Sequence, residues 1–146
     1  MEMKSYDYLE DIAIADIAFL ARGKDLPETF EAASDALTNV MVEDLDTIRP
    51  LENRAISLQN DDLEMLLFDF LQELIYYKDT DGLALRVPTI ELKRFGAEHH
   101  LDAVARGERI DPERHHTRAD VKAVTLHHFS LQKTPSGWQA RVILDI

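Results

Sequence analysis

Cysteine is absent from the 146-residue sequence, which excludes disulfides, thiolate metal ligands and cysteine nucleophiles. Glycine is scarce, with 5 residues and no glycine-rich motif, so we expect no loop that cradles phosphate groups. No apolar run approaches the roughly 20 residues that a membrane-spanning helix needs. We therefore expect a cytoplasmic protein with no membrane partner, whose chemistry depends on oxygen or nitrogen groups.

Basic residues are also few: 16 Lys and Arg stand against 28 Asp and Glu, and the formal net charge is -12. A nucleic-acid-binding protein gains affinity by replacing counterions with clustered cations, and this composition opposes such binding. We expect no direct contact with nucleic acid, so any role in RNA metabolism passes through another protein. With 45% hydrophobic and 30% charged residues the chain should fold, and we expect one domain over residues 1–146.

Hydrophobic periodicity and turn-forming residues predict the secondary structure. Two helices are expected where an apolar stripe follows a capping aspartate, after Asp25 and after Asp61-Asp62. In chain order we predict a strand over 11–20, a helix over 26–41, a strand over 54–59, a helix over 62–77, strands over 83–87, 90–95 and 99–105, and a terminal hairpin of 121–133 and 138–146. Pro88 indicates an edge position or a bulge, and Gly107 indicates a break.

The order of these elements, βαβα followed by further strands, defines the expected fold class. We predict an α+β fold in which two helices pack on a mostly antiparallel sheet. The sequence has no internal repeat and no linker long enough to separate two domains.

All six histidines occur in three adjacent pairs, which are His99-His100, His115-His116 and His127-His128. Neighbours in a strand point to opposite faces, so neither the first nor the last pair should chelate one ion with both rings. The HxH and HxxxH spacings of zinc sites are missing, and no serine lies in a nucleophile-elbow motif. A metal-dependent hydrolase is therefore disfavoured, although it stays open as an alternative.

Carboxylates form the most unusual feature, at the end of the sequence. Asp145 and the terminal carboxylate of Ile146 are adjacent, and residues 141–146 are strongly strand-forming. Asp16 lies within an apolar run, where a buried carboxylate is costly unless it is paired or bound to metal. If Asp16 met this terminus across the sheet, three hard oxygen donors would suit Ca²⁺, Mg²⁺ or Mn²⁺. Alternatively, Asp145 is a solvated charge and Asp16 lies on a wet strand face.

Other charged residues have two interpretations each. Lys122, next to a predicted strand, either pairs with a site carboxylate or a partner's phosphate-bearing ligand, or is simply solvated. A further set of carboxylates consists either of extra ligands or of surface charge: Asp7, Asp11, Glu108 and Asp111.

Several separated blocks resemble the archease family from about Tyr8 to Ile146. They are Ala15-Asp16-Ile17, the first-helix block 26–33, the second-helix block 62–67 with 71–74, Gly107-Glu108 with Asp111 and His115, the block 121–127 (VKAVTLH), and the terminal block 142–146 (VILDI). Each block is weak alone, and together they are specific.

The resemblance implies a role and a site. Archeases assist RtcB-type ligases in guanylylation, the step that loads GMP on the ligase before RNA ends are joined in tRNA splicing or RNA repair. The archease supplies no covalent chemistry, so the resemblance implies an activator rather than an enzyme. It also implies a divalent metal site, with calcium foremost, formed by Asp16, Asp145 and Ile146. Lys122 and His115 lie in matching blocks and are expected to contact the partner or to support the metal ligands.

One departure from the family pattern affects the expected partner contacts. A His-Thr pair usually precedes the Ala-Asp block, whereas Ala13 and Ile14 stand there in this sequence. Any contact made by that histidine is lost, so the protein either has a re-tuned partner or activates its ligase more weakly. The main alternative is an acidic interaction or chaperone-like module without a metal.

Overall fold

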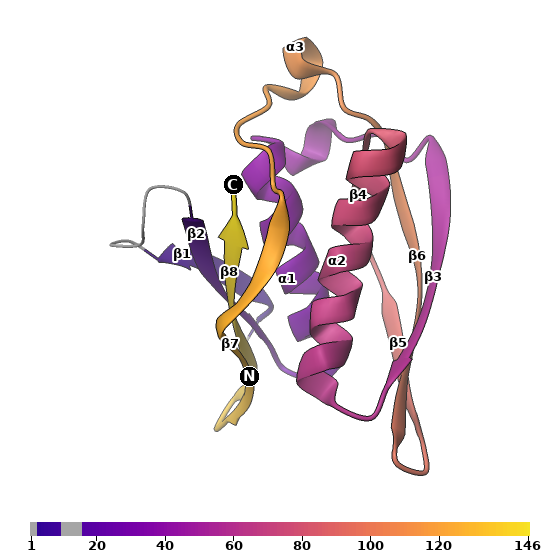
Figure 1. The fold of residues 1–146 in the computed structure, drawn as a ribbon, viewed down its shortest axis with the longest axis vertical. Helices are drawn as coiled ribbons and strands as arrows, with labels where there is room; N and C mark the ends of the chain where they lie inside the picture. The colour runs from indigo at the N-terminus through magenta and orange to yellow at the C-terminus, as the bar shows by residue number, and fades with distance from the viewer. Residues whose placement is uncertain (1–2, 10–15) are drawn as a thin grey trace.

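The computed structural model describes residues 3–9 and 16–146. Its elements are β1 (Ser5–Leu9), β2 (Asp16–Gly23), α1 (Leu26–Met41), a 3-10 turn η1 (Leu45–Thr47), β3 (Glu52–Asn60), α2 (Leu63–Asp81), β4 (Leu83–Arg86), β5 (Ile90–Phe95), β6 (Glu98–Arg109), α3 (Pro112–His115), β7 (Ala123–Thr134) and β8 (Gly137–Asp145). Figure 1 shows α1 and α2 between two sheets, and each helix contacts strands of both.

Both sheets are antiparallel. The first has the strand order β1-β2-β8-β7, and the second has the order β3-β6-β4, with β5 also paired to β6. The predicted α+β class is therefore confirmed, including the terminal hairpin of β7 and β8. The structure adds that the strands divide into two sheets around the helices.

The two long helices begin where the capping residues predict. The Asp25 carboxylate accepts the N–H of Glu28 at 3.0 Å, and the Asp62 carboxylate accepts the N–H of Glu64 at 2.9 Å. Helix α2 continues to Asp81 instead of ending at Tyr77. It stops where Gly82 takes a left-handed conformation at φ 69° and caps the last turn.

Apolar faces of both helices meet in the core between the sheets. The rings of Phe30 on α1 and Phe70 on α2 stack with centroids 6.2 Å apart, and both side chains are fully buried. Phe19 of β2 and Leu101 of β6 close the core on either side. Each such side chain contributes about 1.5–3 kcal/mol through burial, so the helix pair ties the two sheets together.

The sequence indicated a strand break at Gly107, but this prediction is wrong. Gly107 lies inside β6. A Cβ atom at this position would overlap the carbonyl of Ala84 on β4, so the glycine permits a close approach of two strand backbones. Pro88 lies between β4 and β5, and both of these strands pair with β6. The proline therefore interrupts the run of strand residues, as the sequence predicts.

Strand limits near the N-terminus differ from the prediction. The strand expected over 11–20 is observed as β2 from Asp16 to Gly23, and residues 11–15 lie outside the described residues. Strand β1 was not predicted, and neither was α3, whose four residues are too few to show a helical period.

Candidate metal site and its surroundings

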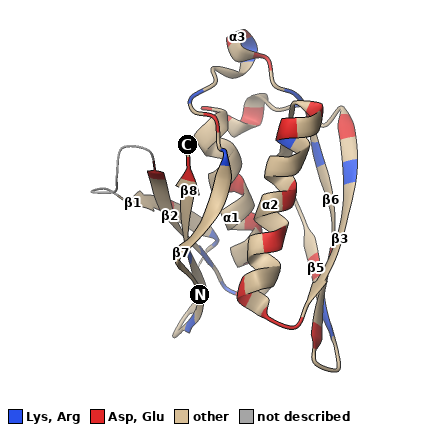
Figure 2. Ribbon diagram, viewed as in Figure 1, with Lys and Arg blue, Asp and Glu red and all other residues tan. Residues whose placement is uncertain are grey.

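Asp16 and Asp145 lie directly opposite each other, because Asp16 begins β2 and Asp145 ends the neighbouring strand β8. Opposed residues in an antiparallel pair project from the same face, with Cβ atoms about 4.5–5.5 Å apart. The next pair, Ile17 and Leu144, packs into the core, so the two carboxylates are on the outer face of the first sheet. Figure 2 shows acidic residues at these adjoining strand ends.

Neither carboxylate has a neutralising partner. Within the described ranges, the side chains of Asp16 and Asp145 make no hydrogen bond or ion pair, and both residues are half-buried. Two adjacent anions repel each other, and a divalent cation bound between them would remove that repulsion. Oxygen donors of this type suit Ca²⁺, Mg²⁺ or Mn²⁺, so the donor set fits a hard cation.

Within the described residues, a third protein donor would have to be something other than a side chain of His, Asp or Glu. No group of three such side chains that could hold a metal occurs among residues 3–9 and 16–146. Ile146 directly follows Asp145 and is half-buried. The strand register thus places the side chains of Asp16 and Asp145 opposite each other, while the expectation that Ile146 supplies a third ligand stays a prediction.

Lys122 lies beside the same strand end. Its backbone N–H donates to the carbonyl of Asp145 at 2.8 Å, one residue before β7 begins at Ala123. Its side chain is exposed, and the ammonium group makes no ion pair in the part of the chain that the structure describes. The backbone of Lys122 therefore adjoins Asp145, and its charged side chain is exposed.

His115 is an internal residue. Its side chain is fully buried, its Nδ1 atom accepts the N–H of Asp111 at 2.8 Å, and its Nε2 atom lies 3.1 Å from Glu108. Because Nδ1 accepts, the proton of the neutral ring is on Nε2 and is donated to Glu108. A surface contact between His115 and a partner is not available in this arrangement. Its hydrogen bonds join it to Asp111, Arg114 and Glu108 rather than to Asp16 or Asp145, so they hold α3 rather than the candidate metal ligands.

Glu108 accepts hydrogen bonds from three residues of two other chain segments. It is 5% exposed and accepts the backbone N–H of Arg49 at 2.7 Å, the guanidinium of Arg49 at 3.1 and 3.2 Å, and a bond from Arg114. Burial alone would raise the pKa of Glu108, but the bonds from Arg49, Arg114 and His115 outweigh it and hold the pKa well below its usual range. The cluster fixes α3 to β6.

The remaining candidate carboxylates already have partners. Asp7 pairs with Arg22 at 2.6 Å, and the Asp111 carboxylate caps α3 by accepting the N–H of Glu113 at 3.1 Å. Glu108 belongs to the cluster above, and Asp11 lies outside the described residues, as do Ala13 and Ile14. Among the described candidate carboxylates, those of Asp16 and Asp145 are therefore the ones without a partner.

The last histidine pair departs from the prediction. The rings of His127 and His128 contact each other, with centroids 4.1 Å apart, instead of pointing to opposite faces. The reason is an irregularity in β7 between Thr125 and Ser130, where His128 takes a positive φ of 53°. Alternation of side chains fails at such a bulge, so the strand rule did not apply.

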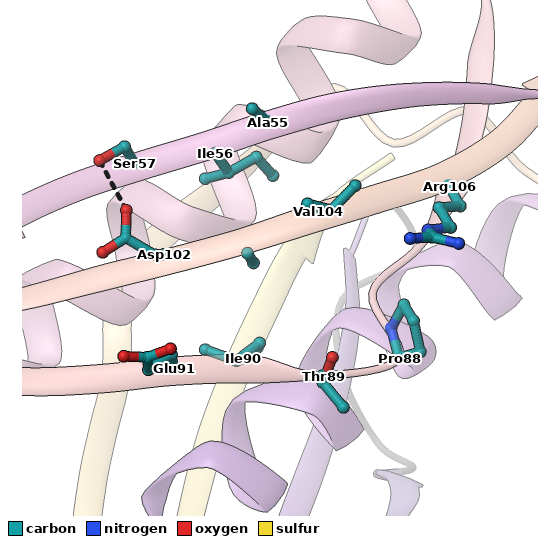
Figure 3. Close-up of a pocket in the computed structure, with 11 residues that line it drawn as sticks. Ala55, Ile56, Ser57, Pro88, Thr89, Ile90, Glu91, Asp102, Val104 and Arg106 are labelled. Atoms are coloured by element: carbon teal, nitrogen blue, oxygen red, sulfur yellow. Dashed lines mark hydrogen bonds between the residues drawn. The ribbon is translucent and has the colours of Figure 1, made fainter.

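A shallow groove of about 680 Å³ lies on the second sheet, away from the carboxylate pair, and is drawn in Figure 3. Its wall includes the apolar residues Ile90 and Val104, and the hydroxyl of Ser57 donates to Asp102 at 2.9 Å. The described residues that line the groove include no histidine.

One finding bears on membrane association. Within the described ranges, the chain has no helix that is both long and apolar enough to cross a lipid bilayer.

Comparison with known proteins gives consistent matches over nearly the whole chain. The Archease protein family matches residues 6–146. A protein named Protein archease from Methanosarcina acetivorans is 40% identical over 144 residues, covering 98% of this chain and 97% of the relative. A protein of the same name from Pyrococcus abyssi is 36% identical over 145 residues, covering 99% of this chain and 100% of the relative.

Solved structures agree with this match. The solution structure of a Methanobacterium thermoautotrophicum protein has a TM-score of 0.83 and 33% identity, covering 97% of this chain and 98% of that chain. A Thermotoga maritima crystal structure, described as an archease and possible chaperone, has a TM-score of 0.58 and 21% identity, covering 92% and 93% of the two chains. At that identity the second likeness shows the fold alone.

Proposed function

The chain belongs to the archease family, and we propose on this basis that it activates an RtcB-type RNA ligase. The activator promotes guanylylation of the ligase, the step that loads GMP before RNA ends are joined in tRNA splicing or RNA repair. The bond-forming chemistry belongs to the ligase, and the activator acts through binding and through charge.

The proposed working site is a divalent cation held by Asp16, Asp145 and the main-chain carboxylate of Ile146. The observation that carries this proposal is the direct opposition of two carboxylates that have no partner among the described residues. Calcium fits these oxygen donors, and so do Mg²⁺ and Mn²⁺. When bound, such an ion would neutralise negative charge on phosphate oxygens of a nucleotide.

The net charge of the chain supports a role in which it contacts the ligase rather than the RNA. A net charge of -12 disfavours contact with the RNA backbone, so the ligase supplies the RNA-binding surface. Lys122, whose backbone N–H bonds to Asp145 and whose side chain is exposed, is the cation we propose to meet an anionic group bound near this strand end.

The proposal is tested with the purified RtcB-type ligase of the same organism. Multiple-turnover RNA joining is measured with GTP and Mn²⁺ after addition of wild-type protein, Asp16→Asn, Asp145→Asn or buffer. Asp61→Asn is the matched control, because Asp61 is exposed in the turn between β3 and α2 and its carboxylate makes no hydrogen bond or ion pair with the described residues. We expect the wild type and the control to stimulate joining, and both site variants to lose stimulation while remaining folded.

Two outcomes would contradict the proposal. If the wild type does not stimulate the ligase, the protein is better described as an acidic interaction or chaperone-like module, with a function altered along with Ala13 and Ile14. If both site variants stimulate as well as the wild type, the activator role stands but does not use the carboxylate pair.

A further inference from the structure

The groove on the second sheet has ends of opposite charge. Its acidic end is formed by Glu91 of β5 and Asp102 of β6, which lie directly opposite each other in the strand register. Its basic end is formed by Arg106, which follows Asp102 by four residues along β6 and lies beside Pro88 in Figure 3. Four strand residues span about 13 Å, so the groove separates a negative from a positive group by roughly this length.

The acidic end keeps acceptor oxygens free. One oxygen of Asp102 accepts the hydroxyl of Ser57 at 2.9 Å, and one oxygen of Glu91 pairs with Lys93 at 2.7 Å. The second oxygen of each carboxylate has no partner among the described residues. Two carboxylates opposite each other repel, and N–H donors of a ligand would bond to the free oxygens and reduce this repulsion.

A second hollow, of about 370 Å³, adjoins the basic end of the groove, and Pro88 and Arg106 line both. Arg86 also lines it and lies directly opposite Arg106 in the pairing of β4 with β6, so two like charges repel each other. Arg86 is neutralised by Asp35 through two bonds of 3.2 Å. The side chain of Arg106 makes no hydrogen bond or ion pair in the part of the chain that the structure describes, so an anion in the hollow would neutralise it.

Helix α1 holds the walls of this hollow in place. The carboxylate of Glu31, which is 8% exposed, accepts the N–H of Ile90 at 3.1 Å and the ammonium group of Lys4 at 3.1 Å. Asp35, one helical turn further along the same face, holds Arg86. The start of β5 and two cations are therefore positioned before a ligand binds, which lowers the cost of ordering them on binding.

The floor between the charged ends is apolar. Val104 of β6 is 41% exposed, and Ala55 of β3 lies directly opposite it in the register. Ile90 lines the groove from β5, and Figure 3 shows it and Val104 between the two ends. The flat body of a ligand can cover these side chains, and the volume of about 680 Å³ is that of a small-molecule site.

We propose that the groove binds a mononucleotide, with its phosphate group at Arg106 and its base at Asp102 and Glu91. A guanidinium group matches the oxygens of a phosphate, and the base supplies the N–H donors for the carboxylates. Guanine carries more such donors on one edge than adenine, so a guanine nucleotide fits the acidic end better. The inference goes beyond the proposed function, because this groove is on the second sheet whereas Asp16 and Asp145 are on the first.

The test follows the amide NMR shifts of the isolated protein while GMP, AMP or inorganic phosphate is added, with EDTA present to exclude divalent cations. We expect saturable shifts with GMP at residues 89–91 and 102–106, and weaker binding of AMP. Arg106→Gln should raise the Kd for GMP about tenfold by removing the phosphate contact. Arg109→Gln is the matched control and should leave Kd unchanged, because Arg109 is an exposed arginine of the same strand that does not line the groove.

A further variant, Asp102→Asn, separates the two ends of the groove. It should weaken the binding of GMP but not of inorganic phosphate, whereas Arg106→Gln should weaken both. Asp102, Arg106 and Arg109 are all exposed, so the three variants should keep the fold, as unchanged shifts in the rest of the spectrum would verify.

Three outcomes would overturn the inference. They are the absence of saturable shifts with GMP at these residues, an unchanged Kd in Arg106→Gln, and equal affinity of the wild type for GMP and inorganic phosphate, which would leave no role for the base. Equal affinity for GMP and AMP would refute the assigned base contacts. The ligase is absent from this experiment, so its failure leaves the proposed activator function standing.

Discussion

Replacing Glu108 by glutamine should destabilise the protein strongly, because this buried carboxylate receives bonds from three residues of two other segments of the chain. Its partners are Arg49, which precedes β3, and Arg114 and His115 of α3. Glutamine keeps the shape and one acceptor oxygen but turns an N–H₂ group toward groups that are all donors. The substitution therefore removes the charge and leaves donors facing donors.

The expected loss follows from these contacts. A hydrogen bond to a charged group is worth about 1.5–3 kcal/mol, and more than one would be lost. The side chain of Arg49 is 60% exposed and that of Arg114 is 35% exposed, so water can solvate both cations after the change. We therefore expect a loss of about 2–4 kcal/mol, or roughly 6–12 °C in Tm for a chain of this size.

The loss should also depend on pH. The pKa of Glu108 is lowered by folding, so its stabilising contribution is complete above the ordinary value of 4.5 and is lost as pH falls through the lowered value. The difference between wild type and Glu108→Gln should therefore be largest near neutral pH and should shrink below about pH 4.5.

Urea unfolding followed by circular dichroism, at pH 7 and at pH 3 to 4, measures both effects. Glu113→Gln is the control, because Glu113 is an exposed glutamate of the same short helix. A loss below about 0.5 kcal/mol at pH 7, the size of an ordinary surface substitution, would refute the stabilising role of this cluster.

Three further predictions concern packing, capping and the terminus. Gly107→Ala should cost about 1–3 kcal/mol in urea unfolding, since the added methyl group would overlap the carbonyl of Ala84, and unchanged stability would refute that close approach. Asp62→Ala should cost about 1 kcal/mol by removing the N-cap of α2, with hydrogen exchange of the first turn as the readout, and equal protection would contradict it. One glycine added after Ile146 should weaken Ca²⁺ or Mn²⁺ binding in calorimetry, whereas a glycine added before Met1 should not, and equal affinities would exclude the terminal carboxylate as a ligand.

Much of the fold was predictable because it depends on local patterns. The apolar stripe of α2, with Leu63, Phe70 and Leu74, has a helical period that no strand could satisfy. The capping aspartates fixed the helix starts to within a residue. For the site, the sequence indicated Asp16 and Asp145 as candidate ligands, and the register places them opposite each other, while their role as metal ligands stays a prediction.

Other features depend on contacts between distant segments and had no local pattern. Arg49 and Glu108 are 59 positions apart, and neither residue type nor spacing identifies such a pair. The bulge of β7 lies in Leu126-His127-His128-Phe129, which has no glycine or proline and resembles an uninterrupted strand. Its shape comes from α2, whose Gln72 and Glu64 bind the strand on either side.

The guanylylation of the ligase itself is the most direct test of the proposed activator role. The purified ligase is incubated with radiolabelled GTP and Mn²⁺, and the rate at which labelled GMP becomes attached is followed with wild-type protein, with Asp145→Asn, or alone. We predict a faster rate with the wild type and the unassisted rate with Asp145→Asn. An equal rate in all three samples, with the proteins folded, would contradict the proposal that this chain activates the ligase through its carboxylate pair.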